Sequence, residues 1–222
     1  MKEVNHHKRV NDIILGSLER PTLQWLAVHM PKWITPDICT AMGVLGALLA
    51  LIGYGLSNYS PIFLWLASLG FILNWFGDSM DGTLARYRRV ERPLYGYYID
   101  HTTDMLCEMM ILLGLGFSPY VSFGIACLML IAYLLLSALV YLRTYVAAEF
   151  KISYGGWGPT ESRAIAVLLN TAMYFFGIQN IKILRTTFSV YDFVVAGIAL
   201  VLFSFFINTA AREARRLSAL GE

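Results

Sequence analysis

Charged residues are scarce in this chain of 222 residues: only 14% are Asp, Glu, Lys or Arg, whereas 57% are hydrophobic. Soluble domains usually carry about a quarter charged residues, so the deficit argues against an ordinary soluble domain. Long uncharged apolar runs account for it, and such runs are typical of membrane-spanning helices. The formal net charge of +2 is too small to indicate a partner such as nucleic acid.

Cysteine is equally sparse. The three cysteines, Cys39, Cys107 and Cys127, are scattered through apolar stretches and form no CxxC pair or Cys/His cluster. This pattern argues against a zinc site and against a disulfide framework. We interpret the three side chains as small buried hydrophobic groups.

The apolar runs predict an all-α integral membrane protein. We expect six transmembrane helices, formed by residues 38–57, 61–84, 96–117, 119–142, 161–179 and 190–211. Apolar and charged residues alternate near residues 10–30, which predicts a helix lying in the membrane surface, with an ordinary cytosolic helix as the alternative. Residues 1–222 are therefore expected to form one membrane domain, with an N-terminal interfacial segment (1–36) and a six-helix bundle (38–211).

The positions of the basic residues predict the orientation of these helices. When the N-terminus is placed inside, only two of the 17 lysines and arginines, Lys182 and Arg185, fall in outer segments. Cytoplasmic loops of membrane proteins carry an excess of Lys and Arg. Both termini are therefore expected to be cytoplasmic.

Acidic residues cluster where the second predicted span ends and the third begins. Asp78 and Asp81 are three residues apart and share a helix face, as do Asp100 and Asp104, which are four apart. Charged side chains within a span are costly and usually functional. A short loop joins the two segments on the cytoplasmic side, so all four carboxylates are expected to converge there. Carboxylate oxygens are the ligands that Mg²⁺ and Mn²⁺ prefer, and Mg²⁺ usually completes its shell with substrate phosphates.

Residues 78–104 resemble the motif of the CDP-alcohol phosphatidyltransferase family. That motif has the form DxxDGxxAR, a short variable stretch, and then GxxxDxxxD. Every element is present here, in the order Asp78, Asp81, Gly82, Ala85, Arg86, Gly96, Asp100 and Asp104.

The resemblance implies a six-helix membrane bundle, usually a homodimer, with a polar cavity open to the cytoplasm. It also implies transfer of a phospho-group from a CDP-linked donor to an alcohol acceptor, with two divalent ions of Mg²⁺ or Mn²⁺. By the resemblance, Asp78, Asp81 and Asp100 bind the metal, and Asp104 lies beside it as the candidate base. His101 is the less favoured candidate.

The resemblance also implies where the donor binds. Gly82 and Ala85 are expected to pack near the cytidine, with Gly96 belonging to the same motif. Arg86 is expected to help hold the donor phosphates, for which an arginine is well suited.

Polar residues outside the motif extend the candidate site. Asp37 and Thr40 precede or begin the first span, where helix capping explains them and donor binding is a compatible role. Arg163 and Arg143 stand at the cytoplasmic ends of the fifth and fourth spans. They are candidate acceptor-binding residues, with snorkelling to the membrane surface as the alternative.

The substrate is open at this point. Asp100-His101 followed by Asp104 is similar to the DHxxD form of choline and ethanolamine phosphotransferases, which favours a CDP-aminoalcohol donor. The short chain is more similar to bacterial members that use CDP-diacylglycerol. A divalent-cation transporter and a CDP-lipid hydrolase remain alternatives. The expected location is a bacterial inner membrane or a eukaryotic endomembrane.

Overall fold

The computed structural model describes residues 15–147, 158–183 and 186–219. In this part of the chain, 82% of the residues lie in helices. The elements are α1 (Gly16–His29), α2 (Pro36–Leu56), α3 (Phe63–Arg88), α4 (Pro93–Phe117), α5 (Phe123–Ala147), α6 (Pro159–Phe176), β1 (Asn180–Ile183), β2 (Thr186–Ser189) and α7 (Val190–Ala219).

Each predicted span corresponds to one long helix, with boundaries that shift by up to eight residues. The prediction ends the second span at residue 84, whereas α3 continues to Arg88. Arg89 then adopts a left-handed backbone conformation with φ 55°, a common way for a helix to end. The predicted N-terminal helix corresponds to α1, and residues 1–14 lie outside the described residues.

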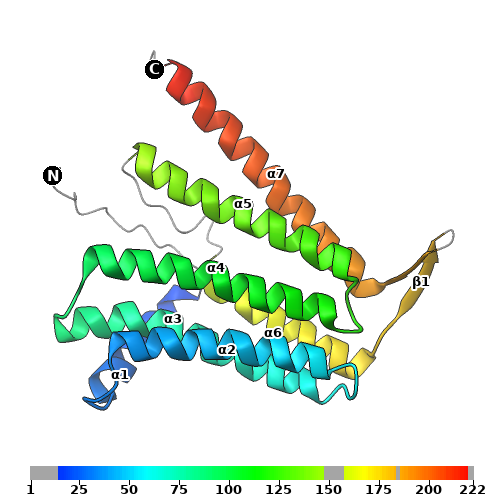
Figure 1. The fold of residues 1–222 in the computed structure, drawn as a ribbon, viewed down its shortest axis with the longest axis horizontal. Helices are drawn as coiled ribbons and strands as arrows, with labels where there is room; N and C mark the ends of the chain where they lie inside the picture. Colours follow the sequence, from blue (N-terminus) through cyan, green and yellow to red (C-terminus); the bar gives the residue numbers. More distant parts are fainter. Residues whose placement is uncertain (1–14, 148–157, 184–185, 220–222) are drawn as a thin grey trace.

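The helices form an elongated bundle in which α2 packs against both α3 and α4 (Figure 1). On the outer sides of this trio, α6 packs on α3, α5 packs on α4, and α7 packs on α5. The start of α2, the end of α3 and the start of α4 meet at one end of the bundle (Figure 1). The acidic residues of the sequence motif are therefore gathered at that end.

Glycines allow α2 and α3 to cross at backbone contact. A Cβ atom on Gly77 would lie 2.2 Å from the backbone nitrogen of Gly43, and one on Gly46 would lie 2.4 Å from that of Asn74. Small residues at helix–helix interfaces permit this close approach in membrane bundles. The crossing sets the distance between the two helices that carry Thr40, Asp78 and Asp81.

We expect Gly77→Ala to destabilise the bundle, because backbone atoms cannot move aside for the added methyl group. Overpacking typically costs about 1–3 kcal/mol, and here the obstacle is backbone rather than a flexible side chain. Gly55→Ala is the matched control, since nothing lies within 4 Å of its added Cβ. Thermal unfolding of both variants in the same detergent measures the difference. Equal unfolding temperatures would contradict the close crossing.

Among the residues that the structure describes, three helical segments are long and apolar enough to cross a membrane by length and composition alone. They are Pro36–Leu56, Phe123–Arg143 and Val190–Ala219. The motif aspartates lie on α3 and α4, and the N-terminal half of α6 carries Glu161 and Arg163. Helices α3, α4 and α6 can therefore cross a membrane only if their polar residues lie inside the bundle, away from lipid.

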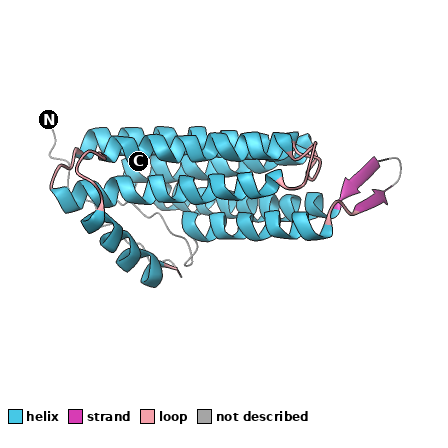
Figure 2. Cartoon of the chain, turned by 90° about the horizontal axis from the view of Figure 1, so that it is seen from below, coloured by secondary structure: helices cyan, strands magenta, loops and turns pink. Residues whose placement is uncertain are grey.

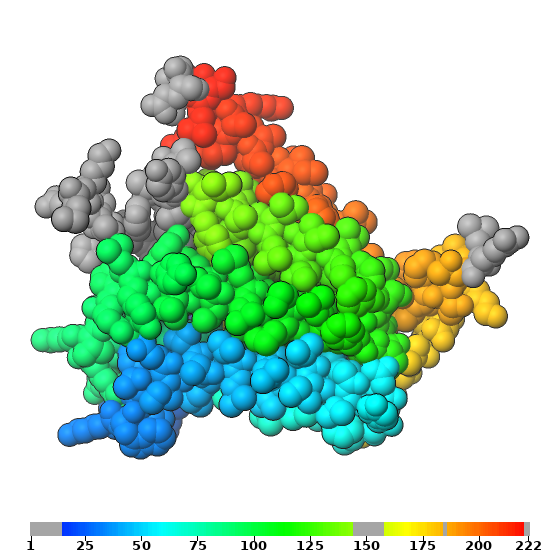
Figure 3. All heavy atoms as spheres, viewed as in Figure 1, coloured from blue at the N-terminus to red at the C-terminus, as the bar shows by residue number. Residues whose placement is uncertain are grey.

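A small β-hairpin interrupts the helical pattern, at a place where the sequence predicts only an outer segment. β1 and β2 pair antiparallel, with Asn180 opposite Ser189 and Ile183 opposite Thr186. The hairpin projects from the end of the bundle opposite the acidic residues, and it stands clear of the helices in the space-filling view (Figures 2 and 3). Buried Asp192 anchors its base by accepting hydrogen bonds from the backbone of Ser189 (2.8 Å) and Ser122 (2.7 Å).

Candidate functional site

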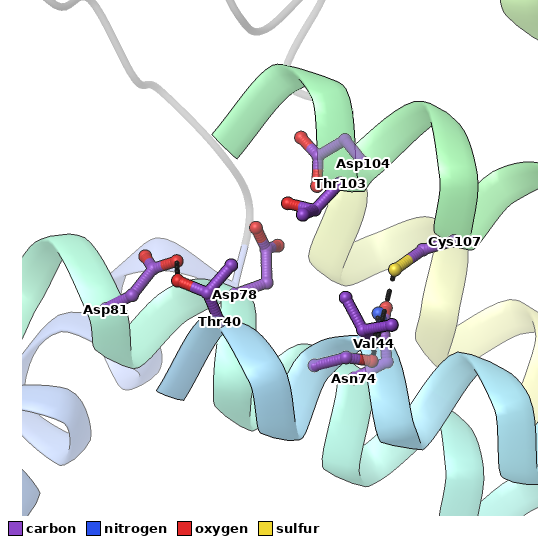
Figure 4. A pocket seen from close by; sticks show the side chains of 9 residues that line it. Thr40, Val44, Asn74, Asp78, Asp81, Thr103, Asp104 and Cys107 are labelled. Atoms are coloured by element: carbon purple, nitrogen blue, oxygen red, sulfur yellow. Dashed lines mark hydrogen bonds between the residues drawn. The ribbon is translucent and has the colours of Figure 1, made fainter. Parts of the chain in front are cut away.

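A pocket opens where α2, α3 and α4 meet at the acidic end of the bundle. Asp78 and Asp81 reach it from α3, and Asp104 reaches it from α4 (Figure 4). The carboxylates of Asp78 and Asp104 point toward the same space between the two helices (Figure 4). The full lining consists of Thr40, Gly43, Val44, Asn74, Asp78, Asp81, Thr103, Asp104 and Cys107.

Asp100 joins the site through its neighbours on α4. One ligand atom from each of Asp100, His101 and Asp104 lies within 4.8 Å of the others, close enough for the three residues to hold one metal ion. The Nδ1 atom of His101 is 3.6 Å from Asp100 Oδ2, and its ring packs against Tyr97 and Tyr141. Carboxylate oxygens with an imidazole suit a divalent ion. The donor set on this face of α4 therefore fits a metal.

Arg163 enters the pocket region from α6 and contacts the carboxylate of Asp78. Its Nη1 atom lies 2.8 Å from Asp78 Oδ2, and its Nε donates to Asn74 Oδ1 at 2.8 Å. From the sequence, Arg163 is a candidate acceptor-binding residue, with snorkelling to the membrane surface as the alternative. The structure pairs it with the candidate metal ligand Asp78, and its role at the acceptor stays a prediction. Asn74 was not identified from the sequence. The sequence feature that could have identified Asn74 is its polar amide within an apolar run. It lies four residues before Asp78, on the same helix face.

Thr40 and Asp37 hold different positions near the start of α2. The Thr40 hydroxyl donates to Asp81 Oδ2 at 2.8 Å, so it orients that carboxylate within the pocket. Asp37 pairs with Arg92 at the exposed start of α4. The cap of α2 is Thr35, whose hydroxyl accepts from the backbone of Ile38. Capping by Thr35 leaves Thr40 available for the site.

The other residues that are expected to bind the CDP-linked donor lie on α3 and α4. Arg86 lies at the last turn of α3, and its Nη2 donates to Thr83 at 3.3 Å. A Cβ added to Gly82 would come within 3.2 Å of the Arg86 guanidinium, whereas one on Gly96 would meet nothing within 4 Å. Ala85 lies between Gly82 and Arg86 on α3. The glycine at position 82 leaves room for Arg86 to fold back along α3.

Most of the bundle, with this pocket included, matches a family model. The model for CDP-alcohol phosphatidyltransferase matches residues 33–205, which is most of the chain. The chain belongs to this family. No match was found among curated proteins.

Membership of the CDP-alcohol phosphatidyltransferase family makes the protein a transferase that moves a phospho-group from a CDP-alcohol. It supports a role in phospholipid synthesis, and together with the apolar helices it indicates a membrane protein. The matched residues include all four motif aspartates. The sequence resemblance is thereby confirmed at the level of the family.

Arg143 is not among the residues that line the pocket. Its Nε atom lies 3.4 Å from Glu213 Oε2, so it joins α5 to α7. Glu213 also contacts Arg216, one turn further along α7. The role of Arg143 at the acceptor stays a prediction.

Helix α1 packs against α3 and is fastened to the bundle by polar contacts, most of them partly buried. Glu19 Oε1 accepts hydrogen bonds from Trp75 (2.9 Å), Ser79 (3.1 Å) and Thr160 (3.0 Å), which ties α1 to α3 and α6. Glu161 accepts from the backbone nitrogens of Leu15 and Gly158, so it joins the beginnings of α1 and α6. These contacts hold Arg163, two residues later, beside α3.

Arg88 secures the connection between α1 and α2. Its guanidinium donates to the backbone carbonyls of Met30 (3.0 Å) and Pro31 (2.8 Å), and also to that of Ile34. Five donors in a planar fork allow one arginine to bind several backbone carbonyls at once. The start of α2, and with it Thr40, is therefore held against the end of α3.

Proposed function

We propose that the protein is a phospholipid-synthesis enzyme that transfers a substituted phospho-group from a CDP-linked donor to an alcohol acceptor and releases CMP. The donor is CDP-diacylglycerol or a CDP-aminoalcohol. The observation that carries the proposal is the meeting of Asp78, Asp81 and Asp104 in one pocket of a chain that belongs to this family. The pocket lies at one end of an apolar bundle, where a charged nucleotide and a lipid can meet.

Asp78, Asp81, Asp100 and Asp104 would hold Mg²⁺ or Mn²⁺, two ions by the resemblance. The ligand atoms of Asp100, His101 and Asp104 are already close together, and Thr40 presents Asp81 toward the same pocket. When bound, such ions offset the negative charge of the diphosphate and of the departing CMP.

The remaining steps are assigned to the chain's own groups. Gly82 and Ala85 pack near the cytidine of the donor, together with Gly96 of the same motif. Arg86 holds the donor phosphates, with Asp37 and Thr40 at the neighbouring start of α2. The acceptor hydroxyl attacks the β-phosphorus, a new P–O bond forms, and the bond to CMP breaks. Asp104 accepts the hydroxyl proton as the attack proceeds. Arg163 and Arg143 are the candidates for contacting the acceptor.

Release of CMP tests the proposal. The purified protein in detergent is supplied with Mg²⁺ or Mn²⁺ and a panel of CDP donors and alcohols, and both CMP and lipid product are measured. We expect CMP release to require an alcohol and to match the lipid formed. CMP release without alcohol would identify a CDP-lipid hydrolase instead. Metal flux into sealed vesicles without CMP release would identify a transporter.

We further propose that α2 to α7 supply six spans, with the pocket and both termini on the cytoplasmic side and two copies forming a homodimer. Basic residues gather at the pocket end, and the hairpin with Lys182 lies at the other. Exposed Leu18 and Trp25 give α1 an apolar face that suits a membrane surface.

Single-cysteine labelling tests this orientation in intact cells or right-side-out vesicles. We expect a membrane-impermeant maleimide added outside to label Lys182→Cys in the hairpin and to leave Arg89→Cys unlabelled. Arg89→Cys should react only after the membrane is opened. A background in which Cys39, Cys107 and Cys127 are replaced by serine or alanine keeps the signal specific. Labelling with the opposite sidedness would invert the proposed topology.

A further inference from the structure

A cation lies beside the carboxylate pocket and contacts one of its lining residues. Arg163 reaches from α6 to α3 and places Nη1 2.8 Å from Asp78 Oδ2, with only 16% of the Arg163 side chain exposed. An arginine stays charged under all ordinary conditions. Asp78 therefore has a neutralising partner before any substrate or metal arrives.

Asn74 holds this arginine in one orientation. Its Oδ1 accepts from Arg163 Nε at 2.8 Å, and its Nδ2 donates to the backbone carbonyl of Gly43 at 3.0 Å. Asn74 is itself buried, and it lies at the close crossing of α2 and α3. The contacts form a continuous path from α2 through Asn74 and Arg163 to Asp78. A guanidinium has a rigid planar fork, so fixing Nε also fixes the direction of Nη1.

A bound divalent ion and this guanidinium place their positive charges on the same carboxylate. Two cations that share a carboxylate repel each other, and the repulsion is poorly screened away from bulk water. An ion that binds at Asp78 must therefore either weaken the contact between Asp78 and Arg163 or bind with lower affinity because of the positive charge of Arg163.

We propose that Arg163 is an internal counter-ion of the carboxylate pocket, positioned by Asn74, which stabilises the metal-free protein and lowers the affinity of the Asp78 site for divalent metal. The inference rests on the metal-dependent function proposed above. It assigns Asn74 a positioning role at a distance from the reacting atoms. It also gives Arg163 a role that needs no acceptor.

Replacing Arg163 with glutamine separates the charge from the shape of the side chain. We expect Arg163→Gln to bind Mn²⁺ about tenfold more tightly, since coupling between two sites is typically about 5–150-fold. The same variant should unfold at a lower temperature without metal, because the acidic residues lose their counter-ion. Added Mn²⁺ should then raise its unfolding temperature more than it raises that of the wild type. Titration of free Mn²⁺ by electron paramagnetic resonance, without donor or alcohol, measures the affinity.

Three further variants complete the test. Arg163→Lys keeps the positive charge, so its affinity for Mn²⁺ should stay within about threefold of the wild-type affinity if the effect of Arg163 comes from its charge. Asn74→Ala releases Nε and should tighten Mn²⁺ binding in the same direction as Arg163→Gln, although less. Arg216→Gln removes an exposed arginine at the end of α7 and should leave the affinity unchanged.

Unchanged or weakened Mn²⁺ binding in Arg163→Gln would overturn the counter-ion role. If that variant does not fold, an affinity for Asn74→Ala equal to that of the wild type would overturn it instead. A raised acceptor KM with unchanged Mn²⁺ affinity would show that Arg163 contacts the acceptor, which also overturns the inference. Because the titration contains no CDP donor, tighter Mn²⁺ binding would support the counter-ion even if the CMP assay failed.

Discussion

Asp81→Asn and Asp100→Asn are each expected to abolish CMP release while leaving the fold intact. Both carboxylates stand at the end of the bundle where α3 and α4 meet, one lining the pocket and the other beside Asp104 on α4. An asparagine keeps the size of the side chain but carries no charge to bind a cation. Loss of a group that orients a metal ligand already costs about 10–100-fold, so loss of a ligand should cost at least about 100-fold.

The measurement is CMP release over a range of Mg²⁺ concentrations, together with thermal unfolding of each variant. We expect the unfolding temperature without metal to stay the same or rise, because one repelling charge has been removed from a crowded site. Glu91→Gln, an exposed acid in the loop between α3 and α4, is the control and should keep full activity. Near-normal turnover of both aspartate variants at saturating Mg²⁺ would refute the metal assignment.

Asp104→Asn should lose most of kcat while it still binds the donor in a metal-dependent way. Asp104 faces Asp78 across the pocket, whereas His101 is not among the lining residues and packs against Tyr97 and Tyr141. A carboxylate beside the donor can accept the proton of the attacking hydroxyl, a contribution typically worth about 100- to 10,000-fold. We therefore expect a loss of kcat in that range.

The pH dependence of kcat separates Asp104 from His101. A base must be deprotonated to act, so kcat should fall on the acidic side of the wild-type profile, and Asp104→Asn should lose that limb. His101→Ala should keep the limb and lose less activity. A larger loss in His101→Ala, with disappearance of the acidic limb, would make His101 the base. Loss of metal-dependent donor binding in Asp104→Asn would make Asp104 chiefly a metal ligand.

The main features of the fold follow from local patterns that the chain carries in each segment. Apolar runs between charged or proline-containing stretches predicted six long helices, and the structure has one helix for each. The length of an apolar run is a property of a single segment. A helix can therefore be recognised from it without knowing which other helices it packs against. The hairpin was not anticipated, because strands of four residues carry little periodic signal. Asp192 joins the base of the hairpin to Ser122, which lies 70 positions earlier in the chain.

The candidate site was likewise predictable in part from the sequence alone. The spacing of Asp78 and Asp81, and of Asp100 and Asp104, predicted two shared faces, since helical geometry alone places such residues together. The same spacing made the family recognisable, and the match over residues 33–205 agrees with it.

Only the tertiary structure decided which partners the charged and polar side chains take. Arg163 and Asn74 are 89 positions apart, and nothing in the local sequence of either residue specifies the other. Arg143 and Arg163 looked alike as basic residues at helix ends, yet one pairs with Glu213 and the other with Asp78. A side chain finds its partner through the packing of whole helices. The close crossing at Gly43 and Gly77 and the attachment of α6 to α3 place the guanidinium of Arg163 on Asp78.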